Sequence, residues 1–171
     1  MTWGEASQLA PLFGTGIAGL ALITAVASIA IQRKLARCRA AIDFFVKTEM
    51  DESMIAAFRS FDDGVKEFRS FLSMEAFMES QHSRSIQRYL NIHELMAVGV
   101  HTKIFDQRVC YTFWSDILAA HHNDTERLIA HIRRQPGGSA TYEDLLRLHR
   151  RWNGRRWIWQ RWRSYRWPFC L

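Results

Sequence analysis

The sequence has 171 residues and a net charge of +6, a length that leaves room for one small soluble domain beside a membrane segment. Residues 32–41 carry four positive charges and no negative one, residues 42–146 carry a net charge of −5, and residues 147–171 carry eight arginines and no acid. The cysteines, Cys38, Cys110 and Cys170, are odd in number and widely spaced. This pattern argues against a disulfide framework.

The first predicted element is a transmembrane helix within residues 1–31. Residues 9–31 contain no charged side chain, and 23 helical residues at 1.5 Å each span the roughly 30 Å hydrocarbon core of a bilayer. Four basic residues follow this segment, whereas only Glu5 precedes it. The positive-inside rule therefore predicts a single-pass protein of the bacterial inner membrane, with its N-terminus outside and its C-terminal domain in the cytoplasm.

Two other interpretations of this segment are weaker. The tripeptide at 25–27, Ala-Val-Ala, imitates a signal-peptidase site, but a signal peptide carries its positive charge before the apolar run. The Gly-x-Gly-x-x-Gly at 14–19 has no preceding strand, so the dinucleotide-binding interpretation fails. Small residues four apart instead favour close helix–helix packing in the membrane, and the residues predicted for it are Gly14, Ala18, Ala21 and Ala25.

Residues 32–152 predict an all-α cytoplasmic domain, in which the membrane helix first continues as a stalk to about Met50. Apolar residues recur at helical spacing, and no proline occurs between residues 32 and 135. Ile86–Val100 has the widest apolar face, so we expect this helix at the centre of a small bundle.

Local signals predict where the other helices begin and end. Helix starts are predicted at Asp51 and Asp106, which resemble N-caps, at Asn123 with Glu126, which resembles a capping box, and at Thr141. Residues 62–64, Asp-Asp-Gly, predict a turn, and residues 135–138, Gln-Pro-Gly-Gly, predict a helix end.

The sequence at 86–106 resembles a known family. Ile86-Gln87-Arg88-Tyr89-Leu90-Asn91, Glu94-Leu95, Ala97-Val98-Gly99-Val100 and Ile104-Phe105-Asp106 are similar to the core of an uncharacterised bacterial domain-of-unknown-function family. This chain has His101-Thr102-Lys103 where such members more often end in glycine. The resemblance covers residues 33–152 and implies one N-terminal span followed by a small cytoplasmic helical domain. It implies no activity.

Three groups of side chains are candidates for a catalytic or metal site. Glu79 and His82 form a Glu-x-x-His pair, but di-iron bundles need two such motifs and further glutamates. His121 and His122 point about 100° apart on a helix, and we interpret them as cations at a helix C-terminus. His93 lies on the apolar stripe, where a hydrogen-bonded core histidine is expected. We therefore predict no catalytic residue, no metal site and no cofactor, and a protein that is not an enzyme.

Residues 153–171 form a basic aromatic tail. Arginine attracts anionic lipid and tryptophan favours the headgroup region, so the tail is expected to contact either the bilayer or a partner protein. The predicted contact residues are Trp157, Trp159, Arg161, Trp162, Arg163, Arg166 and Trp167. The same composition serves single-stranded nucleic acid, which is a less expected partner. Packing of the tail on its own domain also stays open.

These features predict a non-catalytic, membrane-anchored accessory subunit of a larger bacterial membrane assembly. Its expected partners are the lipid bilayer and other membrane-protein subunits. Two alternatives stay open on sequence grounds. One is a membrane-attached defence or stress effector whose tail acts on lipid, and the other is a metal-dependent helical enzyme that uses Glu79 and His82.

Overall fold

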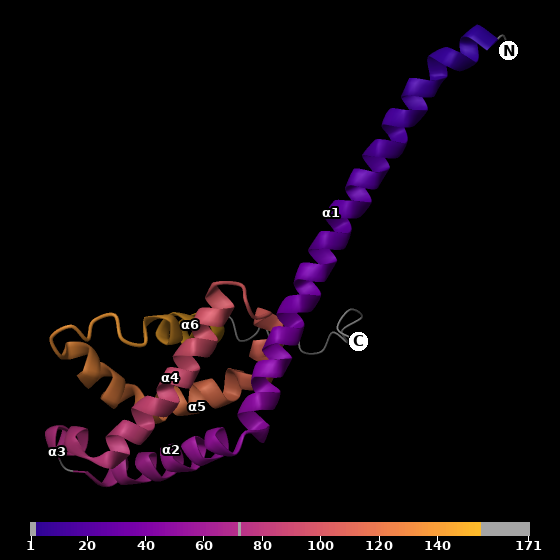
Figure 1. The fold of residues 1–171 in the computed structure, drawn as a ribbon. Helices are drawn as coiled ribbons and strands as arrows, with labels where there is room; N and C mark the ends of the chain where they lie inside the picture. The colour runs from indigo at the N-terminus through magenta and orange to yellow at the C-terminus, as the bar shows by residue number, and fades with distance from the viewer. Residues whose placement is uncertain (1–2, 72, 155–171) are drawn as a thin grey trace. The chain divides into compact units, whose positions relative to one another are not determined.

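The structure, a computed structural model, describes the backbone of residues 3–71 and 73–154, and the side chains of this part from residue 18 onward. The described residues form helices without any strand, which confirms the all-α prediction. The chain divides into two units, Met1–Ala36 and Arg37–Leu171. The helices shown in Figure 1 are α1 (Trp3–Met50), α2 (Glu52–Ser70), α3 (Met74–Glu79), α4 (Gln81–His101), α5 (Gln107–Arg134) and α6 (Glu143–Asn153).

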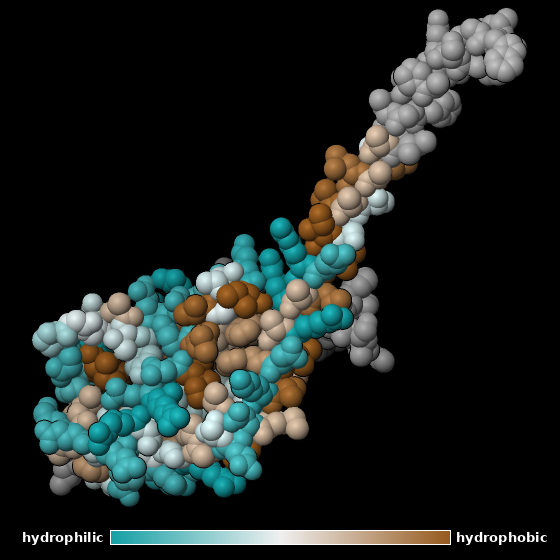
Figure 2. Space-filling model, viewed as in Figure 1, coloured by the Kyte–Doolittle hydropathy of each residue, from teal (hydrophilic) through white to brown (hydrophobic). Residues whose placement is uncertain are grey.

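Helix α1 is the long N-terminal apolar helix, and it continues to Met50 as predicted. Its described part from Ala18 onward is long and apolar enough to cross a membrane by length and composition. The side chains of residues 18–34 are all exposed within the molecule. In Figure 2 this stretch is mostly brown and tan, and teal residues follow where the basic side chains begin.

The C-terminal turns of α1 belong to the second unit and are more than a free stalk. Cys38, Ala41 and Phe45 are buried there. The backbone N–H of Asp106 donates a hydrogen bond to the carbonyl oxygen of Arg37 over 3.2 Å. The rings of Phe45 and Trp114 have centroids 5.8 Å apart. The last part of the helix is therefore one wall of the bundle core.

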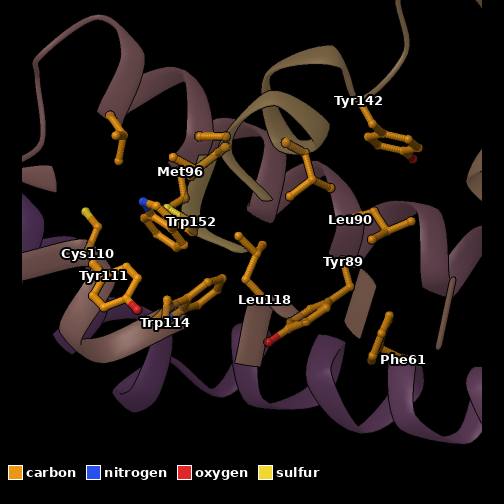
Figure 3. Packing of buried hydrophobic residues seen from close by; sticks show 14 of the residues in the cluster. Phe61, Tyr89, Leu90, Met96, Cys110, Tyr111, Trp114, Leu118, Tyr142 and Trp152 are labelled. Atoms are coloured by element: carbon orange, nitrogen blue, oxygen red, sulfur yellow. The ribbon is translucent and has the colours of Figure 1, made fainter. Parts of the chain in front are cut away.

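Helix α4 is the central element of the second unit, as its apolar face predicted. It contacts α2, α3, α5 and α6. Ile86, Leu90 and Met96 on this helix are at most 1% exposed, and Figure 3 shows Leu90, Met96 and Tyr89 directed into the packed interior. Burying a large aliphatic side chain contributes about 1.5–3 kcal/mol, so this face is a main source of stability.

The predicted turn at residues 62–64 is wrong, because α2 runs through it. Gly64 is buried at the contact between α2 and α4. A Cβ atom at Gly64 would lie 3.0 Å from Cγ1 of Ile86 and 3.1 Å from the carbonyl oxygen of His82. The glycine therefore serves the close approach of two helices, and the flanking acids Asp62 and Asp63 bind Lys66 on the exposed side.

The predicted helix start at Asn123 is also wrong, because α5 is continuous from Gln107 to Arg134. Asn123 is exposed in the middle of this helix. The other α5 signals are confirmed. The Asp106 carboxylate accepts hydrogen bonds from the N–H groups of Arg108 and Val109 at 2.9 and 3.1 Å, and the helix ends directly before Gln135.

Helix α6 begins two residues after the predicted start at Thr141, and it has no side-chain cap of its own. Its first N–H groups are bound by the carboxylate of Glu94 in α4. Oε2 of Glu94 accepts from the N–H of Leu145 at 2.7 Å, and Oε1 accepts from the N–H of Asp144 at 3.2 Å. A negative charge at a helix N-terminus is favourable. The cap therefore comes from a residue about fifty positions earlier in the chain.

Lys103 and Tyr142 are the non-glycine residues with positive φ in the described part, at 62° and 56°. Lys103 follows the end of α4, where the N–H groups of Ile104 and Phe105 both bind the carbonyl oxygen of Gly99 at 2.9 Å. A glycine adopts this left-handed conformation without the Cβ penalty.

Replacing Lys103 by glycine should stabilise the protein, because Lys103 is exposed and its backbone is left-handed. We expect Lys103→Gly to raise the free energy of unfolding by about 1 kcal/mol. Tyr142→Gly relieves the same backbone strain but removes a side chain that is only 5% exposed, so it should destabilise by about 3–5 kcal/mol. Urea denaturation followed by circular dichroism measures both. Destabilisation by Lys103→Gly would contradict the proposed strain.

Candidate functional site

Two histidines meet in the interior of the second unit, His93 on α4 and His121 on α5. His93 is 1% exposed. Its Nε2 lies 3.0 Å from Nδ1 of His121, and its Nδ1 lies 3.1 Å from the carbonyl oxygen of Tyr89, one turn earlier in α4. The wide apolar stripe of α4 carries His93 inward, and α5 presents His121 to it.

The carbonyl of Tyr89 determines where the protons of this pair sit. A carbonyl oxygen only accepts, so Nδ1 of His93 carries the hydrogen and donates it. In neutral His93, Nε2 then accepts from Nδ1–H of His121, which leaves Nε2 of His121 as an acceptor. Burial lowers the pKa of His93 to about 3, assisted by His121, and lowers the pKa of His121 to about 4. Both rings are neutral at physiological pH.

Aromatic rings surround the pair. The ring centroid of His121 lies 4.6 Å from that of Phe61, and His93 lies 4.9 Å from Tyr89 and 4.7 Å from Trp114. Figure 3 shows Phe61, Tyr89 and Trp114 in this part of the core. Burial, with a contribution from the charge of Glu49, raises the pKa of the Tyr89 hydroxyl to about 12, so the phenol stays protonated.

A cavity of about 640 Å³ lies against this cluster. Its walls are mainly apolar. They come from the last turn of α1, the first turns of α2, and the middle parts of α4 and α5. The lining residues are Thr48, Glu49, Met54, Ile55, Phe58, Tyr89, Ile92, Trp114, Asp116, Ile117, Ala120 and His121. A second cavity of about 300 Å³ shares Glu49, Trp114 and Ile117 with it and reaches Ile42, Val46 and Phe113.

A second histidine pair joins α5 to α6. The rings of His122 and His149 are stacked, with centroids 3.7 Å apart and planes inclined by 14°. Burial lowers the pKa of both, that of His149 to about 4. His122 and His121 therefore face different neighbours, as their adjacent positions predicted. The prediction that His121 and His122 act as cations at a helix C-terminus is wrong, because these two residues lie in the middle of the continuous α5.

Hydrogen bonding and burial limit the reactivity of His93 and Cys110. Both nitrogens of His93 are occupied by hydrogen bonds. In the described part of the chain, no three His, Cys, Asp or Glu side chains gather as metal ligands. Burial raises the pKa of the Cys110 thiol to about 12, and a protonated thiol is a poor nucleophile.

The structure separates Glu79 from His82. Glu79 ends α3, Ser80 caps α4, and His82 stands exposed in the first turn of α4. The polar stretch at 79–85 is thus a break followed by a helix start, and the two residues do not share one helical face. This removes the geometric basis of the i, i+3 metal pair.

The predicted contact residues are only partly within the described range. Ala18, Ala21 and Ala25 are exposed on α1, whereas Gly14 lies in the first part of α1, whose surroundings the structure does not describe. The predicted tail contacts between Trp157 and Trp167 also lie outside them. Sequence reasoning missed the cavity entirely. Its one signal was His93 on an apolar stripe, which did not reveal the partner His121.

One family matches the chain, over residues 15–152, and it is described as "Domain of unknown function (DUF4760)". The match covers most of the sequence, and the chain belongs to this family. Comparisons with curated proteins and with solved structures gave no significant match.

The buried histidine pair should make the protein less stable in acid. The ordinary histidine pKa of 6.5 falls to about 3 for His93 in the fold. Between these values the unfolded chain binds a proton that the folded chain does not, so the free energy of unfolding falls as pH decreases. His93→Gln, which can keep both hydrogen bonds, should reduce the pH slope by up to about 1.4 kcal/mol per pH unit near pH 5.

Urea denaturation at several pH values between 7 and 5 measures this slope. His82→Gln is the matched control, because His82 is an exposed histidine on the same helix. If the free energy of unfolding depended on pH in the same way for wild type and His93→Gln, His93 would not be held neutral by the fold.

Proposed function

We propose that this member of the DUF4760 family is a non-catalytic, membrane-anchored accessory subunit of a bacterial inner-membrane assembly. In this proposal α1 crosses the membrane with the N-terminus outside, and the helical domain lies in the cytoplasm. The observation that carries the proposal is the exposure of the apolar part of α1, described above.

Exposed apolar side chains on this helix need a non-aqueous environment. Leu20, Ile23 and Val26 are 66%, 67% and 60% exposed within the molecule. Each large aliphatic side chain gains about 1.5–3 kcal/mol when it leaves water. A bilayer supplies this gain along the whole segment. A row of such residues in water would instead favour aggregation.

The orientation is supported by the charges that flank the segment. Arg33, Lys34, Arg37 and Arg39 follow it closely, and positive charges near the end of a span are retained in the cytoplasm. The small residues Ala18, Ala21 and Ala25 remain the proposed contacts of this helix with another membrane helix.

The accessory role rests on the small size of the helical domain and on the basic aromatic tail that follows it. The composition of the tail at 153–171 is a second argument for an accessory subunit that contacts other molecules. Four of the seven tryptophans lie in this tail, where they are interleaved with arginines. Tryptophan and arginine are enriched in the residues that dominate binding energy at protein interfaces, and both also suit the membrane surface.

A charge placed in the apolar part of α1 should prevent insertion, whereas the same change in its C-terminal part should not. Val26→Arg should cost about 2.5–3.5 kcal/mol of insertion free energy. Val46→Arg is the matched control, since Val46 is 49% exposed on the same helix within the second unit. A reporter active only outside the cytoplasm, fused before Met1, should work in wild type and Val46→Arg and fail in Val26→Arg. Activity of this reporter when fused after Leu171 instead would reverse the proposed orientation.

Removing residues 155–171 should weaken association and leave the fold intact. We expect the truncated chain to remain in the membrane through α1, to unfold at the wild-type temperature, and to recover fewer partner subunits in a gentle-detergent purification. Substituting Arg161, Arg163 and Arg166 by lysine keeps the charge and is the control for a purely electrostatic contact. A truncated chain with lower thermal stability and unchanged recovery would mean that the tail contributes to the fold instead.

A further inference from the structure

The 640 Å³ cavity described above has the size and lining of a small-molecule site. Ligand pockets in proteins commonly have volumes of about 300–1,000 Å³ and mainly apolar walls with few polar groups. Here Met54, Ile55 and Ile92 supply aliphatic wall, and Phe58, Tyr89 and Trp114 supply aromatic wall. Tyr89 and Trp114 are 8% and 4% exposed, while Phe58 is 45% exposed and stands nearer to solvent.

Among the residues that the structure describes, the charged groups lining this cavity are Glu49 from α1 and Asp116 from α5, and no described lysine or arginine lines it. Glu49 is exposed and lies close enough to Tyr89 for its charge to add to the effect of burial in raising the pKa of the Tyr89 hydroxyl. The Glu49 carboxylate would repel an anionic ligand and attract a cationic one.

Two further features favour a positive charge in the cavity. Phe58, Tyr89 and Trp114 line the cavity, and aromatic rings attract a nearby cation through the ring quadrupole. His121, which also lines the cavity, is neutral and offers its Nε2 as an acceptor, because its Nδ1 donates to His93. Its ring therefore adds no opposing charge, and it can accept a hydrogen bond from an ammonium group.

We propose that this cavity binds a small organic cation with an apolar body, either a protonated amine or a quaternary ammonium or phosphonium compound. Its apolar part would contact the aliphatic and aromatic wall, and its charge would lie between the aromatic faces and Glu49. This site is independent of the membrane anchor and of the tail.

Tetraphenylphosphonium and tetraphenylborate test the proposal, because they have nearly the same shape and opposite charge. Equilibrium dialysis of the full chain in non-ionic micelles, with empty micelles as background, measures their binding. We expect saturable binding of the phosphonium ion and an affinity for the borate at least about tenfold lower. Equal affinities, or the absence of saturable phosphonium binding, would overturn the proposal.

Three variants locate the bound ion. Glu49→Gln should weaken phosphonium binding roughly three- to tenfold, and Glu79→Gln, at an exposed glutamate on α3 outside the cavity, should not change it. Ala120→Phe, which fills the cavity from an exposed position on α5, should abolish it. Equal effects of the two glutamate substitutions, or full binding by Ala120→Phe, would place the ion elsewhere and overturn the proposal.

Two alternative occupants give distinct results in the same assay. If the chain's own basic tail filled the cavity, removing residues 155–171 would increase the affinity for the phosphonium ion. If a second copy of the chain filled it, the affinity would fall as the protein concentration rises. Either result would overturn the proposal of a free ligand site.

Discussion

The second unit depends on burying one helix, α4, on several sides at once. Because α4 contacts α2, α3, α5 and α6, each of its inward side chains must fit a different neighbour. Ile86 lies where Gly64 lets α2 approach, His93 hydrogen-bonds to His121 of α5, and Glu94 caps α6. The packing of three other helices is therefore specified by the residues of this one.

A buried polar group is costly unless it is hydrogen-bonded, and His93 shows how the fold meets that requirement. The carbonyl of Tyr89 accepts one hydrogen bond and His121 donates the other. Burial keeps both rings neutral, and these hydrogen bonds set their tautomers, so that Nε2 of His121 is left as an acceptor. The same burial that shapes the core thus sets the protonation of His121, which lines the proposed binding site together with Glu49.

The two units use apolar surface in different ways. The bundle encloses its apolar residues, including Cys38, Ala41 and Phe45 at the end of α1. The described apolar residues of α1 between positions 18 and 31 are exposed within the molecule. The membrane-anchor proposal and the ligand proposal accordingly rest on separate observations, and each can fail without the other.

The sequence alone determined the elements whose signals are local. The structure confirms several predictions that follow from neighbouring residues alone. They are the continuation of α1 to Met50, the buried apolar face of Ile86–Val100, the N-caps Asp51 and Asp106, and the helix end at residues 135–138. Only the tertiary structure decided the rest. Gly64 resembles a turn residue, but it lies inside α2 where this helix packs against α4. Asn123 resembles an N-cap, but α5 continues through it. The Glu94 cap, the His93–His121 bond and the cavity join residues far apart in the chain, and no local spacing encodes which distant side chains will meet.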